Sequence, residues 1–588
     1  MWILRLNMSD RTYHLEDVPA AYKLLGGRGL TSTIVHDEVP PMCHPLGPNN
    51  KLVFAPGIVT GTAAPSSARI SAGAKSPLTG GIKESNAGAS FSPALANMGI
   101  KALVVEGQPK EKGKYWMVHL TWDANAKKPK VEFFPADEYA GKELYGAYAK
   151  LYERFGAKAS IAGCGVAGEY GYGNSGVVYN DLNKLPSRYS GRGGLGAVMA
   201  SRGLKFIVAD SSGAPGVAIQ DKALFDQGRK KLTEALREHG ITKPKGTLNT
   251  YGTAALINVL SEAGGLPTRN FSSGRFEGAA KTGGEAIFAG IKERTGKETY
   301  NHACSPGCII QCSNTWYKPD GTPHVSCQEY ESVWALGANC DIDDLDDTGE
   351  LIRLCNAYGV DTIETGTALA VAMEAGVLPF GDGKKAIELV HEMGKGTPLG
   401  RILGGGTELT GKAFGVIHVP TVKGQSMPAY EPRAVKGIGI TYATSPMGAD
   451  HTAGYTVAPE ILSVGGKADP LSPEGKAALS RAFQATTAFA FDSTGHCLFV
   501  AFAVLDIASG FDGLMEECNA LLGTKWTAAD AAKLGAEILK KERAFNEAAG
   551  LGKQADRVPE FMKYEKLPPH NQVWDVPDSA LDSVFGEM

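Results

Sequence analysis

The chain has 588 residues, of which 43% are hydrophobic and 21% are charged, as in folded globular proteins rather than disordered or fibrous ones. Its length predicts about three or four domains at roughly 150 residues each. The formal net charge of -4 provides no basic surface for nucleic acid or an anionic membrane. The ten cysteines follow no disulfide framework, and the sequence shows neither a signal peptide nor a membrane-spanning apolar run. We therefore expect a cytoplasmic protein.

The first part of the chain, residues 1–210, is expected to be β-rich. Short apolar runs bounded by turn residues predict strands at residues 52–55, 102–106, 115–122 and 131–134. Between them, small and hydroxyl-bearing residues surround Arg69 and Asn86. Backbone amides and an arginine fork suit a phosphate or a polar heterocycle, although a plain surface loop is an equal alternative.

A second glycine-rich loop, Gly191 to Gly196, formally matches G-x-G-x-x-G, and Asp210 follows at about the distance that a dinucleotide fold requires. That fingerprint needs a strand immediately before it. The preceding residues 183–190 are polar and contain Pro186, which speaks against such a strand. We therefore interpret the loop as a cradle for a phosphate or a pterin.

Beyond about residue 220 the apolar residues recur at helical spacing. Helices are predicted at residues 222–239, 253–263, 345–358, 362–375, 385–393, 399–403 and 528–548. The fold class is thus α+β and multidomain, with a β-rich N-terminal domain before two mostly α-helical ones. We place the boundaries at 1–210, 211–415 and 416–588.

Three cysteines, Cys304, Cys308 and Cys312, fall within nine residues. Pro306 and Gly307 exclude a regular helix through the first interval, so we expect a loop that enters a helix near Ile309. Clustered thiolates bind Fe–S clusters, Zn and Cu(I). There are three alternatives. The cysteines could be ordinary buried residues. A zinc site usually has paired two-residue spacings, which this chain lacks, and a radical-SAM site has two residues in its second interval, where this chain has three.

A fourth ligand must come from elsewhere, and Cys497, after the turn-prone residues 493–495, is the candidate. His302 and His496 flank these cysteines and either adjust the cluster through hydrogen bonds or serve packing. The other six cysteines show no spacing for a second cluster. Electrons must therefore leave through a partner protein.

Taken together, the motifs resemble the tungsten-dependent aldehyde:ferredoxin oxidoreductase family nearly from end to end. The order and separation of the motifs carry the resemblance, rather than any one of them. They are Gly26–Leu30, Ala64–Arg69, Lys75–Gly81, Gly191–Met199, Cys304–Cys312, Glu329–Asn339, Gly359–Ile363, Tyr430–Arg433 and Asp492–Cys497.

The resemblance implies tungsten, or molybdenum, held by the dithiolenes of two pterins, with magnesium between the pterin phosphates and a [4Fe–4S] cluster nearby. It implies that Cys304, Cys308, Cys312 and Cys497 hold the cluster. It further implies that Arg69 and Arg192 contact pterin or phosphate, and that carbonyl oxygens of Asn86 and Gly193 lie near magnesium. Two loops should each hold one pterin: one carries Asp361, and the other carries Asp492 and His496.

For catalysis the resemblance implies Glu331 as general base, His451 as a group that polarises the carbonyl or moves the proton, and Tyr430 as a further hydrogen bond. Each also has an ordinary reading. A glutamate in Glu-Tyr-Glu is more often solvated or ion-paired, and Glu329 is an alternative base. His451, between Asp450 and Thr452, would without the resemblance more often be a capping or turn residue.

The sequence departs from the family pattern at three places. The first interval between the cysteines has three residues instead of two, Asn356 stands where the pterin motif has an aspartate, and His496 replaces a leucine. These departures indicate a divergent subgroup, and they bear on the substrate more than on the cofactors.

The function that the resemblance implies is anaerobic oxidation of a small aldehyde to the carboxylic acid. Electrons would pass through the cluster to ferredoxin or a ferredoxin-like iron–sulfur small subunit. One alternative runs the same cofactors reductively, on a carboxylic acid or an aromatic acyl-CoA. Another, of a different class, is a non-catalytic electron-transfer subunit. Homodimers are common in the family.

Overall fold

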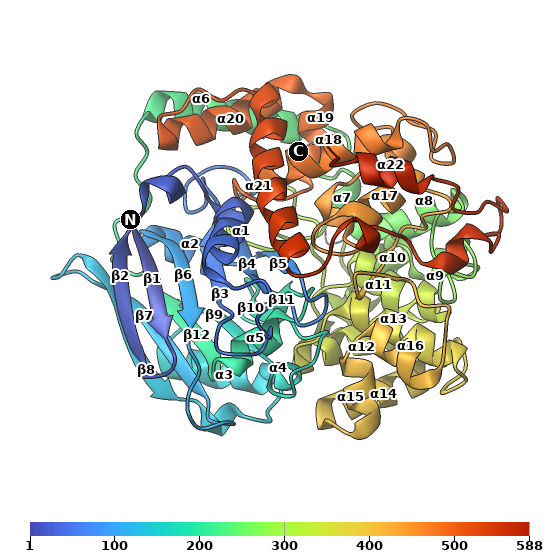
Figure 1. The fold of residues 1–588 in the computed structure, drawn as a ribbon, viewed down its shortest axis with the longest axis horizontal. Helices are drawn as coiled ribbons and strands as arrows, with labels where there is room; N and C mark the ends of the chain where they lie inside the picture. Colours follow the sequence, from blue (N-terminus) through green and yellow to red (C-terminus); the bar gives the residue numbers. More distant parts are fainter. Residues whose placement is uncertain (299, 587–588) are drawn as a thin grey trace.

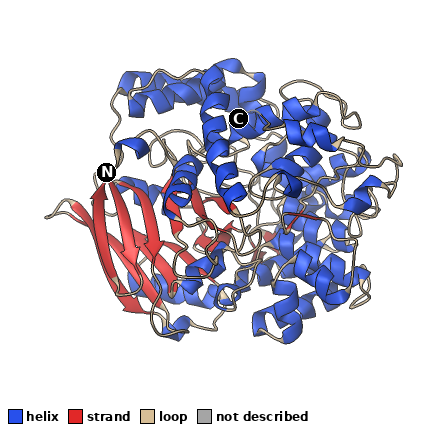
Figure 2. Cartoon of the chain, in the orientation of Figure 1, coloured by secondary structure: helices blue, strands red, loops and turns tan. Residues whose placement is uncertain are grey.

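The computed structural model describes residues 1–298 and 300–586. Strands gather in the N-terminal part, which ends at β12 (Leu204–Asp210), and helices make up most of the remaining chain (Figures 1 and 2). The predicted α+β class, with a β-rich part before a mostly helical part, is therefore confirmed. In the described residues, no helix is both long and apolar enough to cross a membrane.

The first sheet has six strands in the order β2-β1-β6-β3-β4-β5. They are β1 (Trp2–Asn7), β2 (Thr12–Asp17), β3 (Leu52–Pro56), β4 (Arg69–Lys75), β5 (Ile82–Gly88) and β6 (Ile100–Glu106). In the antiparallel β4–β5 pair, Arg69 lies opposite Gly88 and Ser71 lies opposite Asn86. Since side chains alternate along a strand, this register places Arg69 and Asn86 on one face of the sheet.

The second sheet also has six strands, in the order β11-β10-β9-β12-β7-β8. They are β7 (Trp116–Asp123), β8 (Lys128–Pro135), β9 (Ser160–Cys164), β10 (Val177–Asn180), β11 (Pro186–Ser190) and β12. The expectation that no strand precedes the glycine loop is wrong, because β11 leads directly into it. Pro186 is tolerated as the first residue of an edge strand, where its missing N–H costs little. β11 pairs antiparallel with β10, unlike the strands of a dinucleotide-binding βαβ unit.

The two sheets pack against each other through a shared apolar core, which contains Phe54 and Leu103 from the first and Val118 and Ile207 from the second. Helices cover the outer faces: α1 (Gly27–Glu38) covers the first sheet and α3 (Leu144–Phe155) the second. In α3 the buried residues recur at helical spacing and form one apolar face, namely Leu144, Ala147, Tyr148 and Leu151.

Several predicted helices begin at the expected residues because a side chain caps them. Asp344 caps α12 (Leu345–Tyr358) and Asp361 caps α13 (Thr362–Glu374), each accepting a bond from a backbone N–H of the first turn. The other helices of this part are α6 (Lys222–Glu238), α7 (Thr247–Tyr251), α8 (Leu256–Glu262), α9 (Ala279–Thr282), α10 (Gly284–Thr295), α11 (Tyr330–Leu336), α14 (Gly383–Lys395), α15 (Pro398–Gly404), α16 (Thr407–Phe414), α17 (Lys436–Thr444), α18 (Lys476–Ala490), α19 (Val500–Asp506), α20 (Ala508–Leu522), α21 (Ala528–Ala548) and α22 (Asp578–Ser583).

The helical part shares one large apolar core, which includes Leu232 of α6, Trp334 of α11 and Leu514 of α20. α6 and α20 lie side by side (Figure 1). The division at residue 415 stays a prediction. α21 returns to the β-rich part, where Phe545 packs into the core under α1. The N-terminal part is thus held by the last long helix of the chain.

Candidate active site

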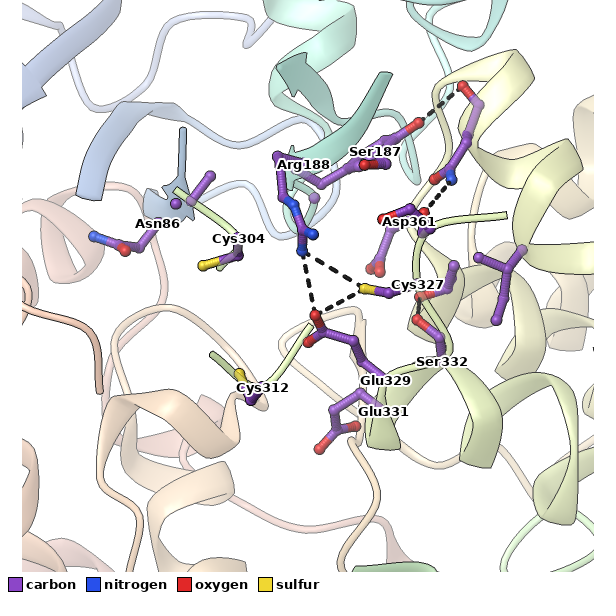
Figure 3. A pocket seen from close by; sticks show the side chains of 18 of the residues that line it. Asn86, Ser187, Arg188, Cys304, Cys312, Cys327, Glu329, Glu331, Ser332 and Asp361 are labelled. Carbon is purple, nitrogen blue, oxygen red and sulfur yellow. Dashed lines mark hydrogen bonds and ion pairs between the residues drawn. The ribbon is translucent and has the colours of Figure 1, made fainter. Parts of the chain in front are cut away.

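A cavity of about 250 Å³ lies where the β-rich and helical parts meet. Its wall joins distant segments of the chain (Figure 3). Arg69, Asn86 and Gly88 come from the first sheet and Arg188 from the second, while the helical part contributes residues that include Cys304, Cys312, Glu329, Glu331, Asp361 and Cys497. Many of the predicted site residues therefore converge on one space.

The cysteine segment is a closed loop. Gly307 and Gln311 have positive φ, and the backbones of His302 and Ser313 exchange two hydrogen bonds of 2.7 and 3.1 Å that close it. The expectation of a helix near Ile309 is wrong, because the N–H groups of Ile309 and Gln311 donate to Oγ of Ser66 and Sγ of Cys308 instead of to the carbonyl groups one turn earlier. His302 thus contributes its main chain to the loop.

Ser66 joins this loop to the segment of Cys497. Its N–H donates to the carbonyl of Gly307 at 2.9 Å, and its carbonyl accepts from the N–H of Cys497 at 2.9 Å. Its Oγ accepts from the N–H of Ile309 at 3.2 Å. Ser66 has a φ of 53°, a left-handed conformation that is uncommon for a residue with a side chain. The loop before Arg69 therefore sets the relative position of the cysteine segments.

Cys304, Cys312 and Cys497 line the cavity, and Cys308 is buried beside them. The pKa of Cys304 is lowered to about 5, chiefly by a hydrogen bond from Cys308 and also by the nearby guanidinium groups of Arg188 and Arg69, which together outweigh the effect of burial. The bond to Cys304 raises the pKa of Cys308, and burial raises the pKa of Cys312. The site therefore favours a thiolate at Cys304, the form that binds soft metals.

No three His, Cys, Asp or Glu side chains in the described residues converge as a single metal ion requires. A four-iron cluster is larger than one ion, so its thiolates surround a volume rather than meet at a point. Four thiols from two loops, beside buried guanidinium groups, match that donor set.

Glu331 and His451, which the resemblance assigns to the active site, lie close together in the structure. Oε1 of Glu331 lies 3.4 Å from Nε2 of His451, and the other carboxyl oxygen accepts a bond from the N–H of Ala429 at 3.1 Å. Burial raises the pKa of Glu331 to about 8 and lowers the pKa of His451 to about 4. The ring of Tyr430 lies 5.8 Å from that of His451, and its hydroxyl is 2.9 Å from the hydroxyl of Tyr455, which sequence reasoning missed.

Arg69 donates through Nε to the side-chain oxygen of Asn86 and through Nη2, at 3.3 Å, to the backbone carbonyl of the same residue. Arg192 is surrounded by protein acceptors, among them Asp361 and Glu364 at 3.1 Å each and Ser426 at 2.8 Å. The carbonyl of Gly193 accepts from the hydroxyl of Ser76 at 2.7 Å. Direct contacts of these residues with pterin, phosphate or magnesium stay predictions.

The second predicted pterin loop is anchored by Arg28. This buried guanidinium donates to Asp492 at 3.1 Å and forks onto Glu542 of α21 at 2.8 and 2.9 Å. Burial raises the pKa of Asp492 to about 6, although Arg28 opposes the rise. His496 lies 3.0 Å from the buried Glu517 and does not line the cavity, so its predicted part at the cofactor stays a prediction.

Sequence reasoning missed a group on the cavity wall that joins Arg188 of β11, Cys327 and Glu329 (Figure 3). The Cys327 thiol donates to Glu329 at 2.9 Å, and Arg188 donates to the carboxylate at 3.3 Å and lies 3.6 Å from the sulfur. Glu329, considered above as an alternative base, is therefore ion-paired. In the sequence, the motif around Glu331 pointed to this part of the wall. Arg188 carried no such signal, because its strand β11 was not predicted.

Three atoms of the cavity wall argue for a bound group. Nε of Arg188, Oγ of Ser326 and Oε1 of Glu331 are buried and have no hydrogen-bond partner among the described residues. Buried polar atoms are nearly always paired, so a ligand in the cavity would satisfy them. The residues present thus fit a polar cofactor as well as an iron–sulfur cluster.

Clustered thiols, buried guanidinium groups and the Glu331 carboxyl around one cavity are typical of a redox enzyme. The family comparison gives the same class. Residues 3–211 match "Aldehyde ferredoxin oxidoreductase, N-terminal domain", and residues 227–587 match "Aldehyde ferredoxin oxidoreductase, domains 2 & 3". The chain therefore belongs to the aldehyde ferredoxin oxidoreductase family, as its motifs indicated.

Curated relatives extend this result. Two proteins called "Tungsten-containing aldehyde ferredoxin oxidoreductase", from Pyrococcus abyssi and Pyrococcus furiosus, are 36% and 35% identical to the chain; both comparisons cover 96% of it, and 92% and 91% of the relatives. The "Aliphatic sulfonate oxidoreductase, WOR-like subunit" of P. furiosus is 26% identical over 93% of the chain and 86% of that protein. These identities fit the predicted divergent subgroup.

One solved structure shares the fold. It is described as "Active site complex BamBC of Benzoyl Coenzyme A reductase in complex with 1,5 Dienoyl-CoA". The TM-score is 0.77 at 17% sequence identity, over 100% of this chain and 93% of that one. At this identity the likeness concerns the architecture alone.

Proposed function

We propose that the protein is a cytoplasmic bis-pterin enzyme of tungsten, or molybdenum, that oxidises aldehydes to carboxylic acids. Electrons would leave through a [4Fe–4S] cluster to ferredoxin or a ferredoxin-like small subunit. The observation that carries the proposal is the position of Glu331, which lines the same cavity as three cluster cysteines and lies 3.4 Å from His451. Family membership supports the same chemistry.

The chain offers a set of residues for each group. Cys304, Cys308, Cys312 and Cys497 would hold the cluster. The pterins and magnesium would lie among Arg69, Asn86, Arg192, Gly193, Asp361, Asp492 and His496. When bound, the metal centre supplies oxygen transfer and accepts two electrons.

The chain's own residues would manage the protons. Conversion of an aldehyde and water to the acid releases two electrons and two protons. Glu331 would accept one proton, since burial raises its pKa to about 8 and makes the ionised form a stronger base than an exposed glutamate. His451, neutral above about pH 4, would accept a hydrogen bond or pass the proton on, and Tyr430 would fix the position of its ring.

Anaerobic metal analysis, followed by an aldehyde panel with a viologen dye, tests the proposal. About one tungsten or molybdenum and four irons per chain, with dye reduction by aldehydes, is the expected result. The metals without aldehyde oxidation would favour the reductive alternative. Iron alone in fully loaded protein would indicate an electron-transfer subunit.

A further inference from the structure

Arg188 extends from β11 into the cavity that three of the predicted cluster cysteines line (Figure 3). β11 is an edge strand of the second sheet, and Tyr189 ties it to α12 by donating to the carbonyl of Asn356 at 3.0 Å. Arg188 is buried, with 7% of its surface exposed. A guanidinium keeps its charge in proteins, so a buried one needs acceptors around it. The strand therefore places a fixed positive charge beside the proposed cluster.

Two of the three nitrogens of this guanidinium have partners in the protein. Nη1 donates to the Glu329 carboxylate at 3.3 Å. Nη2 donates to Oγ of Ser313, the residue after Cys312. Since the backbones of His302 and Ser313 close the cysteine loop, these contacts hold Arg188 against the base of that loop. Protein contacts alone thus fix the direction of the guanidinium.

The third nitrogen, Nε, is buried and has no hydrogen-bond partner among the described residues. A buried N–H is nearly always paired, so an acceptor in the cavity should satisfy it. Among the described residues that line the cavity, Arg69 and Arg188 are the only cations, whereas Glu329, Glu331 and Asp361 contribute carboxyl groups. An anionic group in this cavity would therefore depend on the two arginines for compensating charge.

We propose that Arg188 donates a hydrogen bond through Nε to the iron–sulfur cluster and raises its reduction potential. The inference rests on the proposed function and adds to it a residue that controls electron acceptance. Reduction adds one negative charge to a cluster that four thiolates already make an anion. A nearby cation and a hydrogen bond therefore stabilise the reduced form more than the oxidised one. A higher potential makes the cluster a better acceptor for the electrons that aldehyde oxidation releases.

Glu329 should act in the opposite direction. Its carboxylate pairs with Arg188 and lines the same cavity, so it brings a negative charge to the same space. A negative charge disfavours the addition of an electron to the cluster. The pair therefore predicts shifts of opposite sign when either partner is neutralised, a pattern that loss of packing would not give.

The test is the midpoint potential of the cluster, measured by dye-mediated redox titration of the anaerobic holoenzyme with electron paramagnetic resonance. In Arg188→Met the ratio of reduced to oxidised cluster at a fixed potential should fall about tenfold, which is about 59 mV for one electron. Arg188→Lys keeps the charge and should recover part of the shift. Glu329→Gln should raise the potential. Arg202→Met, which removes a buried arginine that does not line the cavity, should leave the potential unchanged.

Unchanged potentials in both Arg188→Met and Glu329→Gln, in protein with about four irons per chain, overturn the proposal. Loss of tungsten and pterin from Arg188→Met with an unshifted cluster also overturns it, because Nε would then belong to the pterin. If Arg188→Met does not bind iron, the sign of the shift in Glu329→Gln decides.

The proposed function can fail separately from this inference. If fully loaded wild type oxidises no aldehyde while the variants show the two opposite shifts, the aldehyde assignment fails and the role of Arg188 stands. If aldehydes are oxidised and neither variant shifts the potential, the reverse holds. Absence of iron from anaerobically prepared wild type contradicts both.

Discussion

Glu331 and His451 are 3.4 Å apart, and burial moves their pKa values in opposite directions, to about 8 and about 4. Between these values the carboxyl keeps its proton and the imidazole remains neutral. The pair therefore avoids a buried charge, which is costly in such surroundings. For catalysis, this means that the base is available only after Glu331 loses its proton.

The pH dependence of kcat/KM is set by this pair. Glu331 must be ionised to accept a proton, and its raised pKa places that ionisation near pH 8. We expect kcat/KM to increase about tenfold per pH unit below pH 8 and to level off above it. A dye-linked assay from pH 6 to 10 measures this profile. A profile that is flat from pH 6 to 10, as a base with the ordinary glutamate pKa of about 4.3 would give, would contradict the assignment.

Replacement of the base itself gives the second prediction. Glu331→Gln should lower kcat/KM by about 100-fold or more, because general-base catalysis contributes on that order. Iron and tungsten contents should stay unchanged. Glu329→Gln is the informative comparison, since Glu329 pairs with Arg188 at 3.3 Å and is expected to retain more activity. The opposite ranking of the two variants would make Glu329 the base.

Iron content tests the choice of cluster ligands. Cys497→Ser should lower the iron bound per chain and weaken the visible absorption of the cluster, because an alcohol replaces the thiolate. Cys327→Ser is the control within the same cavity, and Cys518→Ser is a buried control outside it. Both should retain about four irons. If Cys327→Ser loses iron and Cys497→Ser keeps it, Cys327 is the fourth cluster ligand and Cys497 is not.

The buried ion pair of Arg28 predicts a large effect on stability. Arg28→Met leaves Glu542, which is 0% exposed, without its cation. Removal of one partner of such a pair costs about 3–5 kcal/mol of the free energy of unfolding, measurable in urea titrations. The double variant Arg28→Met with Glu542→Met should recover part of the loss. Lys222→Met, which breaks an exposed pair with Asp226, should leave the free energy of unfolding nearly unchanged.

The sequence predicted the elements whose signals are local. The helices at Leu345–Tyr358 and Ala528–Ala548 match the predicted bounds because their apolar periodicity and capping residues lie within the segments themselves. Glu331 and His451 were both assigned to the active site from the resemblance, since neither residue carries a local signal for the other. The resemblance did not give the distance between Glu331 and His451.

The missed features depend on partners far along the chain. The role of Ser66 requires the backbones of Gly307 and Cys497, which no local pattern connects to it. β11 was missed because Pro186 interrupts a polar run, although an edge strand accepts proline at its start. His496 was considered for the cluster, yet its ring lies 3.0 Å from a glutamate of α20 that only the fold brings near.

The bridge at Ser66 has a consequence for biosynthesis. One of its partners, the Cys497 segment, is translated long after the β-rich part, which can fold first as the chain emerges. The proposed cluster site is therefore complete only when nearly the whole polypeptide has been made. We expect iron and cofactor to enter after translation, once the segments of Ser66 and Cys497 have met.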